Sequence, residues 1–289
     1  QSVTWPEGWL EAARRILADA ERDPAFAAEA LTLPAESVLA ERMTVVHPDA
    51  LHAARNGLRR YLSDALGDEF HELYRRLAPR EPYRFDPAAA GRRALRNLCL
   101  SYLAESDAPS IRALVLEQYR DADNMTDRFA ALSVLAQSEG AERAEALADF
   151  YERWRDEPLV VNKWLSVQAT SRRRSTLADV RALVAHPAFD LRNPNKVYAL
   201  IGGFAGNHVR FHAADGSGYR FLAEQLLRLD PLNPQVAARL ARAFDRWRRF
   251  DAGRQAHARA ALQEIREREG LSRDVREIVE RTLEVDKKP

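Results

Sequence analysis

Two histidines four residues apart are the first side chains whose types and spacing could do chemistry. His208 and His212 lie in HVRFH, and on a helix this spacing puts both imidazoles on one face, as in the zinc-binding pattern H-E-x-x-H. Val209 stands where that pattern has its general-base glutamate, and no acidic third ligand follows at an obvious offset. The pair is therefore interpreted as ordinary surface or capping histidines, and no catalytic zinc site is predicted.

The second near-match and the lone cysteine lead to the same conclusion. HELYR has Glu72 after His71, but Arg75 replaces the second histidine. Cys99 is the only cysteine, which excludes an intrachain disulfide and a cluster of thiolate ligands. It lies in an apolar helical run, so we expect a buried, inert thiol.

Five of the twelve glycines crowd into the stretch IGGFAGNHVRFHAADGSGY. A P-loop needs a strand before its glycines and Lys-Ser/Thr after them, and this stretch follows a helix-like segment and has neither. Its single Asp215 is too few carboxylates for a calcium loop. We therefore expect Gly202 and Gly203 to allow a neighbouring helix to approach closely, and Gly206 to form a left-handed helix cap. Asp215 or Ser217 is expected to cap the next helix.

The segment NPQVAARLARAFDRWRRF, 233–250, predicts one amphipathic helix with two distinct faces. The apolar residues expected in the core are Val236, Leu240, Ala243, Phe244 and Trp247. The polar residues on an adjoining ridge, at i, i+4, i+7 and i+11, are Gln235, Arg239, Arg242 and Arg246. Such a ridge could line a cavity and offer donors to a peptide carbonyl or carboxylate. The alternative is a solvated face without a ligand.

Composition and charge exclude several classes of protein. The chain has 289 residues, of which 46% are hydrophobic and 30% charged, as in globular proteins. Forty-four basic and forty-three acidic side chains leave a net charge of +1, which argues against a nucleic-acid partner. No window approaches eighteen consecutive apolar residues, so no membrane-spanning segment is predicted. The chain begins on Gln1 without an initiator Met, and we expect it to be a piece of a longer polypeptide.

Helical signals run along the whole chain, and strand signals are nearly absent. Prolines that follow a cap or turn residue mark predicted helix starts at Pro24, Pro48, Pro87, Pro194 and Pro234. An extended gap is expected at 78–87, and Trp5 and Trp9, at i and i+4, are expected in the core. The predicted fold is all-α: a single domain over 1–289, formed by an irregular superhelix or solenoid of stacked antiparallel helix pairs, HEAT/armadillo-like.

Several separate stretches, in order, resemble the C-terminal helical domain of bacterial aminopeptidase N, a gluzincin-type zinc aminopeptidase family. They are DPAFAAEALTLP, RRALRNLCLSYLA, NMTDRFAALS, VVNKWLSVQATS, NPNKVYALIGGFAGN, FHAADGSGY and NPQVAARL. The resemblance covers nearly the whole chain. It implies that the zinc ligands and the glutamate base lie in a separate catalytic domain, N-terminal to residue 1, and that this chain carries no catalytic residue and no metal ligand.

The resemblance also implies a role and partners for this chain. It would close the substrate chamber and control the access of peptides to it, with Gln235, Arg239, Lys196 and Tyr198 lining the chamber. Some relatives carry an arginine where Tyr198 stands. The implied partners are the catalytic domain of the same polypeptide and peptide substrates, with zinc in the full-length enzyme and the cytoplasm as its compartment. The alternative function is a free-standing helical-repeat scaffold that binds a protein.

Overall fold

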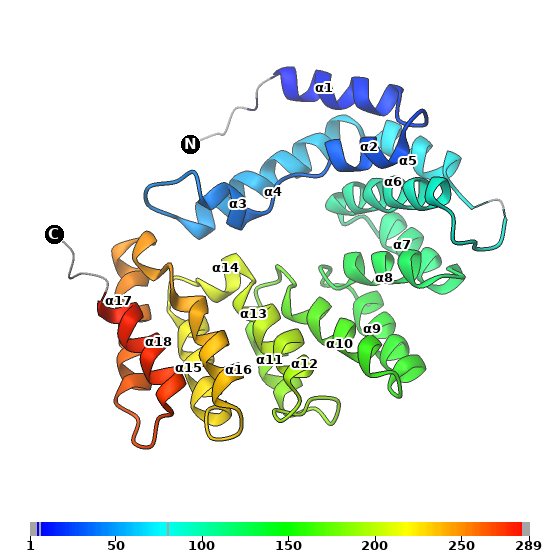
Figure 1. Ribbon diagram of the computed structural model, residues 1–289. Coiled ribbons are helices and arrows are strands. Elements are labelled where there is room, and N and C mark those ends of the chain that lie inside the picture. Colours follow the sequence, from blue (N-terminus) through cyan, green and yellow to red (C-terminus); the bar gives the residue numbers. More distant parts are fainter. Residues whose placement is uncertain (1–4, 6, 80, 285–289) are drawn as a thin grey trace. The chain divides into compact units, whose positions relative to one another are not determined.

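The computed structural model describes residues 5, 7–79 and 81–284, and almost all of them lie in helices or in short links between helices (Figure 1). These residues form no β-strand. One isolated parallel bridge joins Val46 to Phe250. The predicted all-α fold of stacked helix pairs is confirmed. The described part of the gap expected at 78–87 is also without helix as far as Asp86.

The chain forms two compact units, one made of Gln1–Ala35 and His52–Phe150 and the other of Glu36–Leu51 and Tyr151–Pro289. The elements that lie wholly or mainly in the first unit are α1 (Glu7–Ala18), α2 (Pro24–Ala30), α4 (Pro48–Ala65), α5 (Gly67–Arg76), α6 (Pro87–Leu103), η1 (Ala104–Ser106), α7 (Pro109–Asp121), α8 (Met125–Leu135) and α9 (Ala141–Trp154). Those of the second unit are α3 (Glu36–Ala40), α10 (Pro158–Ala169), α11 (Thr176–Val184), α12 (Pro194–Val197), η2 (Tyr198–Gly202), α13 (Gly203–Ala205), α14 (His208–Phe211), α15 (Ser217–Leu229), α16 (Pro234–Ala241), η3 (Arg242–Phe244), η4 (Trp247–Arg249), α17 (Ala252–Arg266) and α18 (Arg273–Glu284).

Helices begin where the sequence predicted them to begin. All five predicted prolines are the first residues of their helices, namely α2, α4, α6, α12 and α16. The residue before the proline also caps four of these helices: the side chains of Asp23, Asp86, Asn193 and Asn233 accept backbone N–H groups of the first turn. Proline loses no hydrogen bond at this position, and the cap satisfies donors that the helix leaves free.

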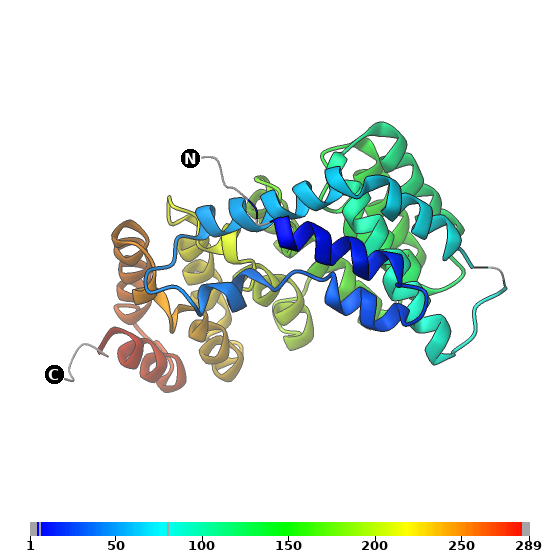
Figure 2. The same ribbon diagram turned by 90° about the horizontal axis from the view of Figure 1, so that it is seen from above.

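In the first unit, the helices pack as neighbouring pairs. α5 and α2 both contact α6, and α7 lies against α8 (Figure 1). α1 lies beside α2, as the view from above shows (Figure 2). Phe70 of α5 stacks on Tyr102 of α6 with ring centroids 4.6 Å apart. Cys99 is fully buried in this core, and burial raises its pKa to about 12, which confirms the prediction of an inert thiol.

In the second unit, α15 and α16 pack side by side, and α16 also contacts α18 (Figure 1). The segment Glu36–Leu51 joins this unit through arginines from the far end of the sequence. The Val46 N–H donates to the Arg249 carbonyl over 2.7 Å, and the Arg249 guanidinium donates to the Met43 carbonyl over 2.6 Å. Arg254, only 6% exposed, pairs with both Asp49 and Asp251. A buried guanidinium is stable here because carboxylates meet it.

The prediction of a single helix over 233–250 is wrong. α16 ends at Ala241, and two short 3₁₀ turns follow. The reason is tertiary: the Trp247 indole N–H donates to the Thr282 carbonyl over 3.2 Å, and the Arg248 guanidinium donates to the carbonyls of Thr282 and Leu283 over 2.6 and 2.8 Å. These bonds satisfy carbonyls at the end of α18. A continuous α16 is replaced by turns that reach them.

The prediction that two tryptophans of the first unit lie in the core is wrong for Trp9 and is met only in part for Trp5. Trp9 is 50% exposed and therefore lies outside the core. Trp5 is partly buried against α4, where a Cβ on Gly57 would come within 3.1 Å of the indole.

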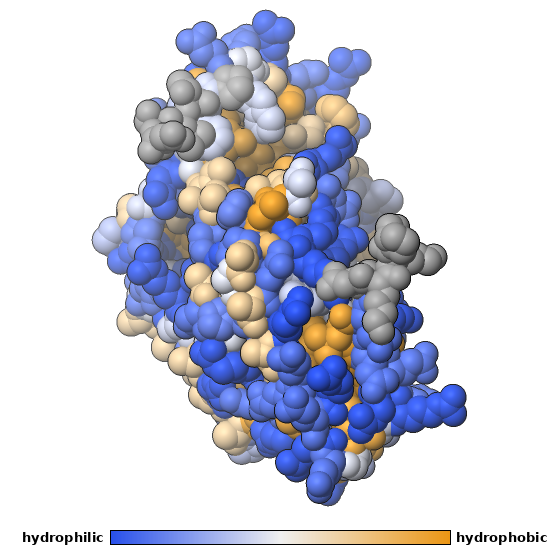
Figure 3. Space-filling view, turned by 90° about the vertical axis from the view of Figure 1, so that its left-hand side faces the viewer, coloured by the Kyte–Doolittle hydropathy of each residue, from blue (hydrophilic) through white to orange (hydrophobic). Residues whose placement is uncertain are grey.

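On the face that Figure 3 displays, hydrophilic residues predominate and hydrophobic ones form small patches, as on ordinary protein surfaces.

We expect Gly218→Ala to lower the free energy of unfolding by about 2 kcal/mol or more, because a Cβ at Gly218 would overlap the carbonyl oxygen of Phe211. Urea unfolding followed by circular dichroism measures the change. Gly67→Ala is the matched control: Gly67 also lies in the first turn of a helix, but a Cβ there would meet nothing within 4 Å. Equal losses in the two variants would contradict this explanation.

Candidate functional site

The four residues that the sequence proposed as a substrate-facing set lie on two short segments of the second unit. Lys196 is in α12 and Tyr198 begins η2; both side chains are partly buried. Gln235 and Arg239 lie one turn apart on α16, and both are exposed. Each segment starts with a capping asparagine and a proline, so the chain direction at both starts is fixed by local sequence.

η2 is a π-helical turn, a rare geometry that the sequence analysis missed. It covers Tyr198–Gly202, and the N–H of Gly203 reaches back to the Tyr198 carbonyl. Such turns occur as single interruptions of α-helices, often at functional sites. The two consecutive glycines were the available signal, but glycine pairs also occur in ordinary turns, so that signal alone did not identify a π-turn.

The predicted close approach at the paired glycines is confirmed at Gly203, whereas the contact at Gly202 does not depend on its missing side chain. A Cβ on Gly202 would lie 3.5 Å from the Leu240 side chain of α16 and 3.8 Å from Tyr198. A Cβ on Gly203 would lie 3.3 Å from Ala169 of α10. A methyl group would therefore fit at Gly202 at an ordinary contact distance, whereas it would be tight at Gly203, whose missing side chain lets α13 lie close to α10.

The contact between α16 and η2 brings Arg239 and Tyr198 together. The Arg239 guanidinium carbon lies 5.3 Å from the centroid of the Tyr198 ring, a cation–π contact. Within the described residues, neither Gln235 nor Lys196 shares in the contact between Arg239 and Tyr198. Two of the four proposed residues therefore touch, and the other two flank them on the same two segments.

The polar ridge predicted along 233–250 is divided by the end of α16. Arg242 pairs with Asp245 over 3.2 Å, and Arg246 pairs with Glu41 over 3.1 Å. Arg239 forms no ion pair with any described carboxylate. Its charge is therefore available to a ligand carbonyl or carboxylate, and the exposed Gln235 amide adds donors and an acceptor one turn away.

The two histidines of HVRFH lie in an aromatic cluster, so their interpretation as surface residues is wrong, although His212 is the C-cap residue of α14. The ring centroids of His208 and His212 are 5.2 Å apart, and His212 stacks on Phe250 at 4.0 Å. The His212 Nδ1 is 2.9 Å from the Tyr219 hydroxyl. Burial, with the nearby His208 and Arg254, lowers the His212 pKa from 6.5 to about 3. This imidazole is neutral at physiological pH.

Searches for two other kinds of site give negative results over the described residues. Within residues 5, 7–79 and 81–284, no three His, Cys, Asp or Glu side chains are grouped so as to hold a metal ion. Across the same ranges, none of the helices combines the length and the apolar character needed to cross a bilayer.

Two expectations for the glycine-rich stretch need correction. Gly206 has right-handed dihedral angles of φ −79° and ψ −11°, so it is not a left-handed cap. Gly216, with φ +69°, holds the left-handed conformation at the start of α15, where His257 leaves no room for a Cβ. Neither Asp215 nor Ser217 is the cap residue of α15, although Asp215 accepts the Ser217 N–H over 2.9 Å.

Comparison with known proteins gives one family and a consistent set of relatives. A family model described as "Domain of unknown function (DUF3458_C) ARM repeats" matches residues 1–284. Aminopeptidase N of Escherichia coli is 40% identical over 284 residues, which cover 98% of this chain and 32% of the relative. Aminopeptidase N of Caulobacter vibrioides is 39% identical over 278 residues, which cover 96% of this chain and 32% of the relative. The chain therefore spans about a third of the length of these curated relatives.

A solved structure shares the fold. The crystal structure of Legionella pneumophila aminopeptidase A in complex with aspartic acid superposes with a TM-score of 0.90 at 32% identity. The match covers 98% of this chain and 34% of that chain.

The free energy of unfolding should fall as the pH is lowered from about 6.5 towards 3. The unfolded chain protonates His212 at its ordinary pKa of 6.5, whereas the folded chain does so only near 3. The contribution of this neutral histidine is complete above pH 6.5 and declines below it, by at most about 1.4 kcal/mol per pH unit for one group. Urea titrations at several pH values measure the slope.

His212→Gln should flatten this slope between pH 6.5 and 4.5, since glutamine keeps a partner for Tyr219 but does not titrate. His47→Gln is the control, because His47 is exposed. An unchanged slope in His212→Gln would contradict the assignment.

Proposed function

The chain belongs to the family described as a domain of unknown function with ARM repeats, and from this premise we propose that it forms the C-terminal helical domain of a zinc-dependent aminopeptidase N. The complete enzyme removes residues from the N-termini of peptides. The support is the coverage of this chain by curated aminopeptidases N, each matched over about a third of its length. The single domain then comprises residues 1–289, within which the two compact units are parts.

The proposed division of labour leaves catalysis to another part of the polypeptide. Zinc bound in the catalytic domain would supply the activated water for peptide hydrolysis. The described residues of this chain do not fit a zinc site, because they hold no suitable group of three ligands. We therefore assign no catalytic step to them.

The proposed contribution of this chain is a polar wall of the substrate chamber that controls access. The observation that carries this proposal is the Arg239 guanidinium, held over Tyr198 without a carboxylate partner among the described residues. A cation in this state can take a peptide carbonyl or a carboxylate without first breaking an ion pair. Gln235 and Lys196 would add hydrogen bonds and charge on either side.

We further propose the partners and compartment that this role requires. The partners are the catalytic domain of the same polypeptide and peptide substrates, and neither nucleic acid nor a membrane takes part. The compartment is the cytoplasm. A single, buried cysteine supports this assignment because a reducing compartment does not use structural disulfides.

The purified 289-residue chain should hydrolyse no aminoacyl reporter substrate and should hold no stoichiometric zinc after dialysis. Reporter assays and elemental analysis measure these two quantities. Zinc-dependent turnover that survives further purification would overturn the proposed division of labour.

In the complete enzyme, Arg239→Ala should raise KM for tri- and tetrapeptides by about tenfold, the effect of one lost charge-assisted hydrogen bond. The KM for single-residue reporter substrates should change by less than about twofold, because they do not extend to this wall. Arg242→Ala is the matched control, since Asp245 already pairs with Arg242. Equal effects of Arg239→Ala on both substrate classes would count against the chamber wall, and no effect on either would favour a scaffold function.

A further inference from the structure

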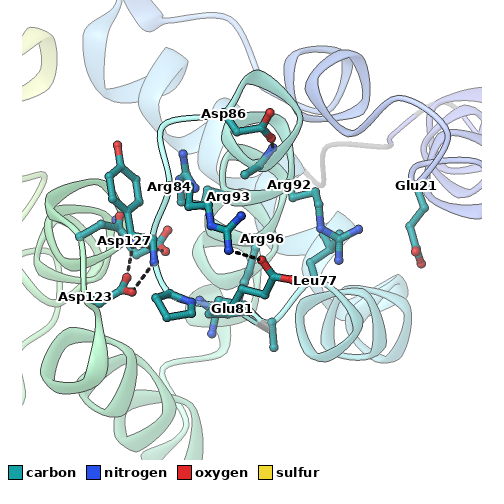
Figure 4. A pocket seen from close by; sticks show the side chains of 16 residues that line it. Glu21, Leu77, Glu81, Arg84, Asp86, Arg92, Arg93, Arg96, Asp123 and Asp127 are labelled. Carbon is teal, nitrogen blue, oxygen red and sulfur yellow. Dashed lines mark hydrogen bonds and ion pairs between the residues drawn. The ribbon is translucent and has the colours of Figure 1, made fainter.

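A cavity of about 520 Å³ lies in the first unit, between residues 78, 79 and 81–86 and the starts of α6 and α8 (Figure 4). Its size is that of small-molecule sites, about 300–1,000 Å³. Arginines of α6 line one part of it, and Asp123 and Asp127 line another. None of these residues belongs to the proposed chamber wall.

Three arginines of the cavity lack carboxylate partners. Arg92, Arg93 and Arg96 lie within about one turn of α6, and none forms an ion pair with another described residue. Arginines elsewhere in this unit show the usual alternative: Arg59 pairs with Glu105 over 2.6 Å. Unpaired cations gathered on one wall of a cavity favour an anionic group of a ligand.

Aromatic rings hold two of these guanidinium groups in place. Arg93 lies over the Tyr83 ring at 4.8 Å, and Arg96 lies over the Tyr74 ring at 4.3 Å. Arg96 also donates to the Tyr74 hydroxyl over 2.9 Å. A guanidinium that lies on a ring is oriented through its face, so most of its in-plane N–H donors remain available.

A buried hydrogen-bond network from four helices supports the cavity. The Tyr74 hydroxyl donates to Gln118 over 2.9 Å, the Gln118 amide donates to Asn97 over 2.8 Å, and the Asn97 amide donates to Asp127 over 2.9 Å. Gln118 and Asp127 are 5% and 3% exposed. Burial raises the Tyr74 pKa, which keeps its hydroxyl a donor. A satisfied buried network fixes side-chain positions, here on both the cationic and the anionic side.

Among the described residues of the cavity, the carboxylates of Asp123 and Asp127 form no ion pair with Arg92, Arg93 or Arg96. Asp123 accepts the Tyr83 N–H over 2.7 Å and the Asn124 amide over 3.0 Å. Asp127 accepts the same Asn124 amide over 3.0 Å. The hydrogen bond from Asn124 contributes most to lowering the Asp123 pKa. The charge of Arg93 also lowers the Asp123 pKa, and Arg84 pairs with Glu81 over 3.3 Å. The cavity thus presents charges of both signs, and Arg92, Arg93, Arg96, Asp123 and Asp127 take no part in the ion pair between Arg84 and Glu81.

We propose that this cavity binds a small zwitterion, a free α-amino acid or a dipeptide, with its carboxylate on Arg92, Arg93 and Arg96 and its ammonium group on Asp123 and Asp127. Both charge signs on the wall disfavour a polyanion, which the two aspartates would repel, and a polycation, which the three arginines would repel. The site is independent of the proposed peptidase function, because its ligand is defined by this cavity alone.

Isothermal titration calorimetry on the 289-residue chain tests the proposal with L-phenylalanine and the dipeptide Ala-Phe as probes. N-acetyl-Ala-Phe lacks the ammonium group, Ala-Phe amide lacks the carboxylate, and inorganic phosphate is a simple anion. We expect one of the two zwitterions to bind with a stoichiometry of one, and each blocked dipeptide to bind at least about tenfold more weakly than Ala-Phe. No binding of either zwitterion at millimolar concentration, or phosphate binding as tight as theirs, would overturn the proposal.

Two variants assign the charges. Arg93→Gln should weaken the affinity for the zwitterion about tenfold. Arg60→Gln should leave this affinity unchanged, because Arg60 is an exposed residue of α4 outside the cavity. Asp123→Asn keeps an acceptor for the Tyr83 N–H, and in this variant the difference in affinity between Ala-Phe and N-acetyl-Ala-Phe should become smaller, with Asp127 as the remaining partner of the ammonium group. Circular dichroism spectra and thermal midpoints confirm folding. Unchanged affinity in folded Arg93→Gln, or an effect of acetylation in folded Asp123→Asn as large as in the original chain, would overturn the assignment.

Discussion

The contact between α16 and the π-turn η2 is the constraint on which the proposed substrate-facing surface depends. Leu240 of α16 lies beside Gly202 of η2, and Arg239, the residue before Leu240, reaches the Tyr198 ring. Either segment alone would present an isolated polar residue. Together they form a surface with a cation of fixed position, built from backbone proximity and not from a loop.

Arginines that lie on tyrosine rings occur at both sites considered for ligands. Arg239 lies over Tyr198 in the second unit, and Arg93 and Arg96 lie over Tyr83 and Tyr74 in the first. Arginines that hold the fold together have other partners: Arg254 pairs with two aspartates, and Arg249 donates to backbone carbonyls. An aromatic face orients a guanidinium without neutralising its charge. Because Arg59 lies over Tyr102 and also pairs with Glu105, it is the lack of a carboxylate partner among the described residues, and not the ring contact alone, that distinguishes Arg239, Arg93 and Arg96.

The sequence predicted those features whose causes are local. Capping residues followed by proline identified five helix starts, and the apolar pattern around Cys99 identified a core helix. The end of α16 at Ala241 was not predictable in this way, because it depends on bonds from Trp247 and Arg248 to residues about thirty-five positions later. The burial of His212 and the cavity around Arg93 also depend on segments that are distant in sequence. The i, i+4 spacing suggested that Gln235 and Arg239 share a ridge, but the contact with Tyr198 required the π-turn.

Photo-crosslinking of a peptide substrate tests the central claim most directly. A tetrapeptide with a photoreactive residue near its C-terminus would be bound to the complete enzyme, irradiated, and the labelled residues mapped by mass spectrometry. The account predicts labels on α12, η2 and α16, around Tyr198 and Arg239, and their loss when an unlabelled tetrapeptide competes. Labels confined to residues outside this chain would contradict the proposal that these helices form a wall of the substrate chamber.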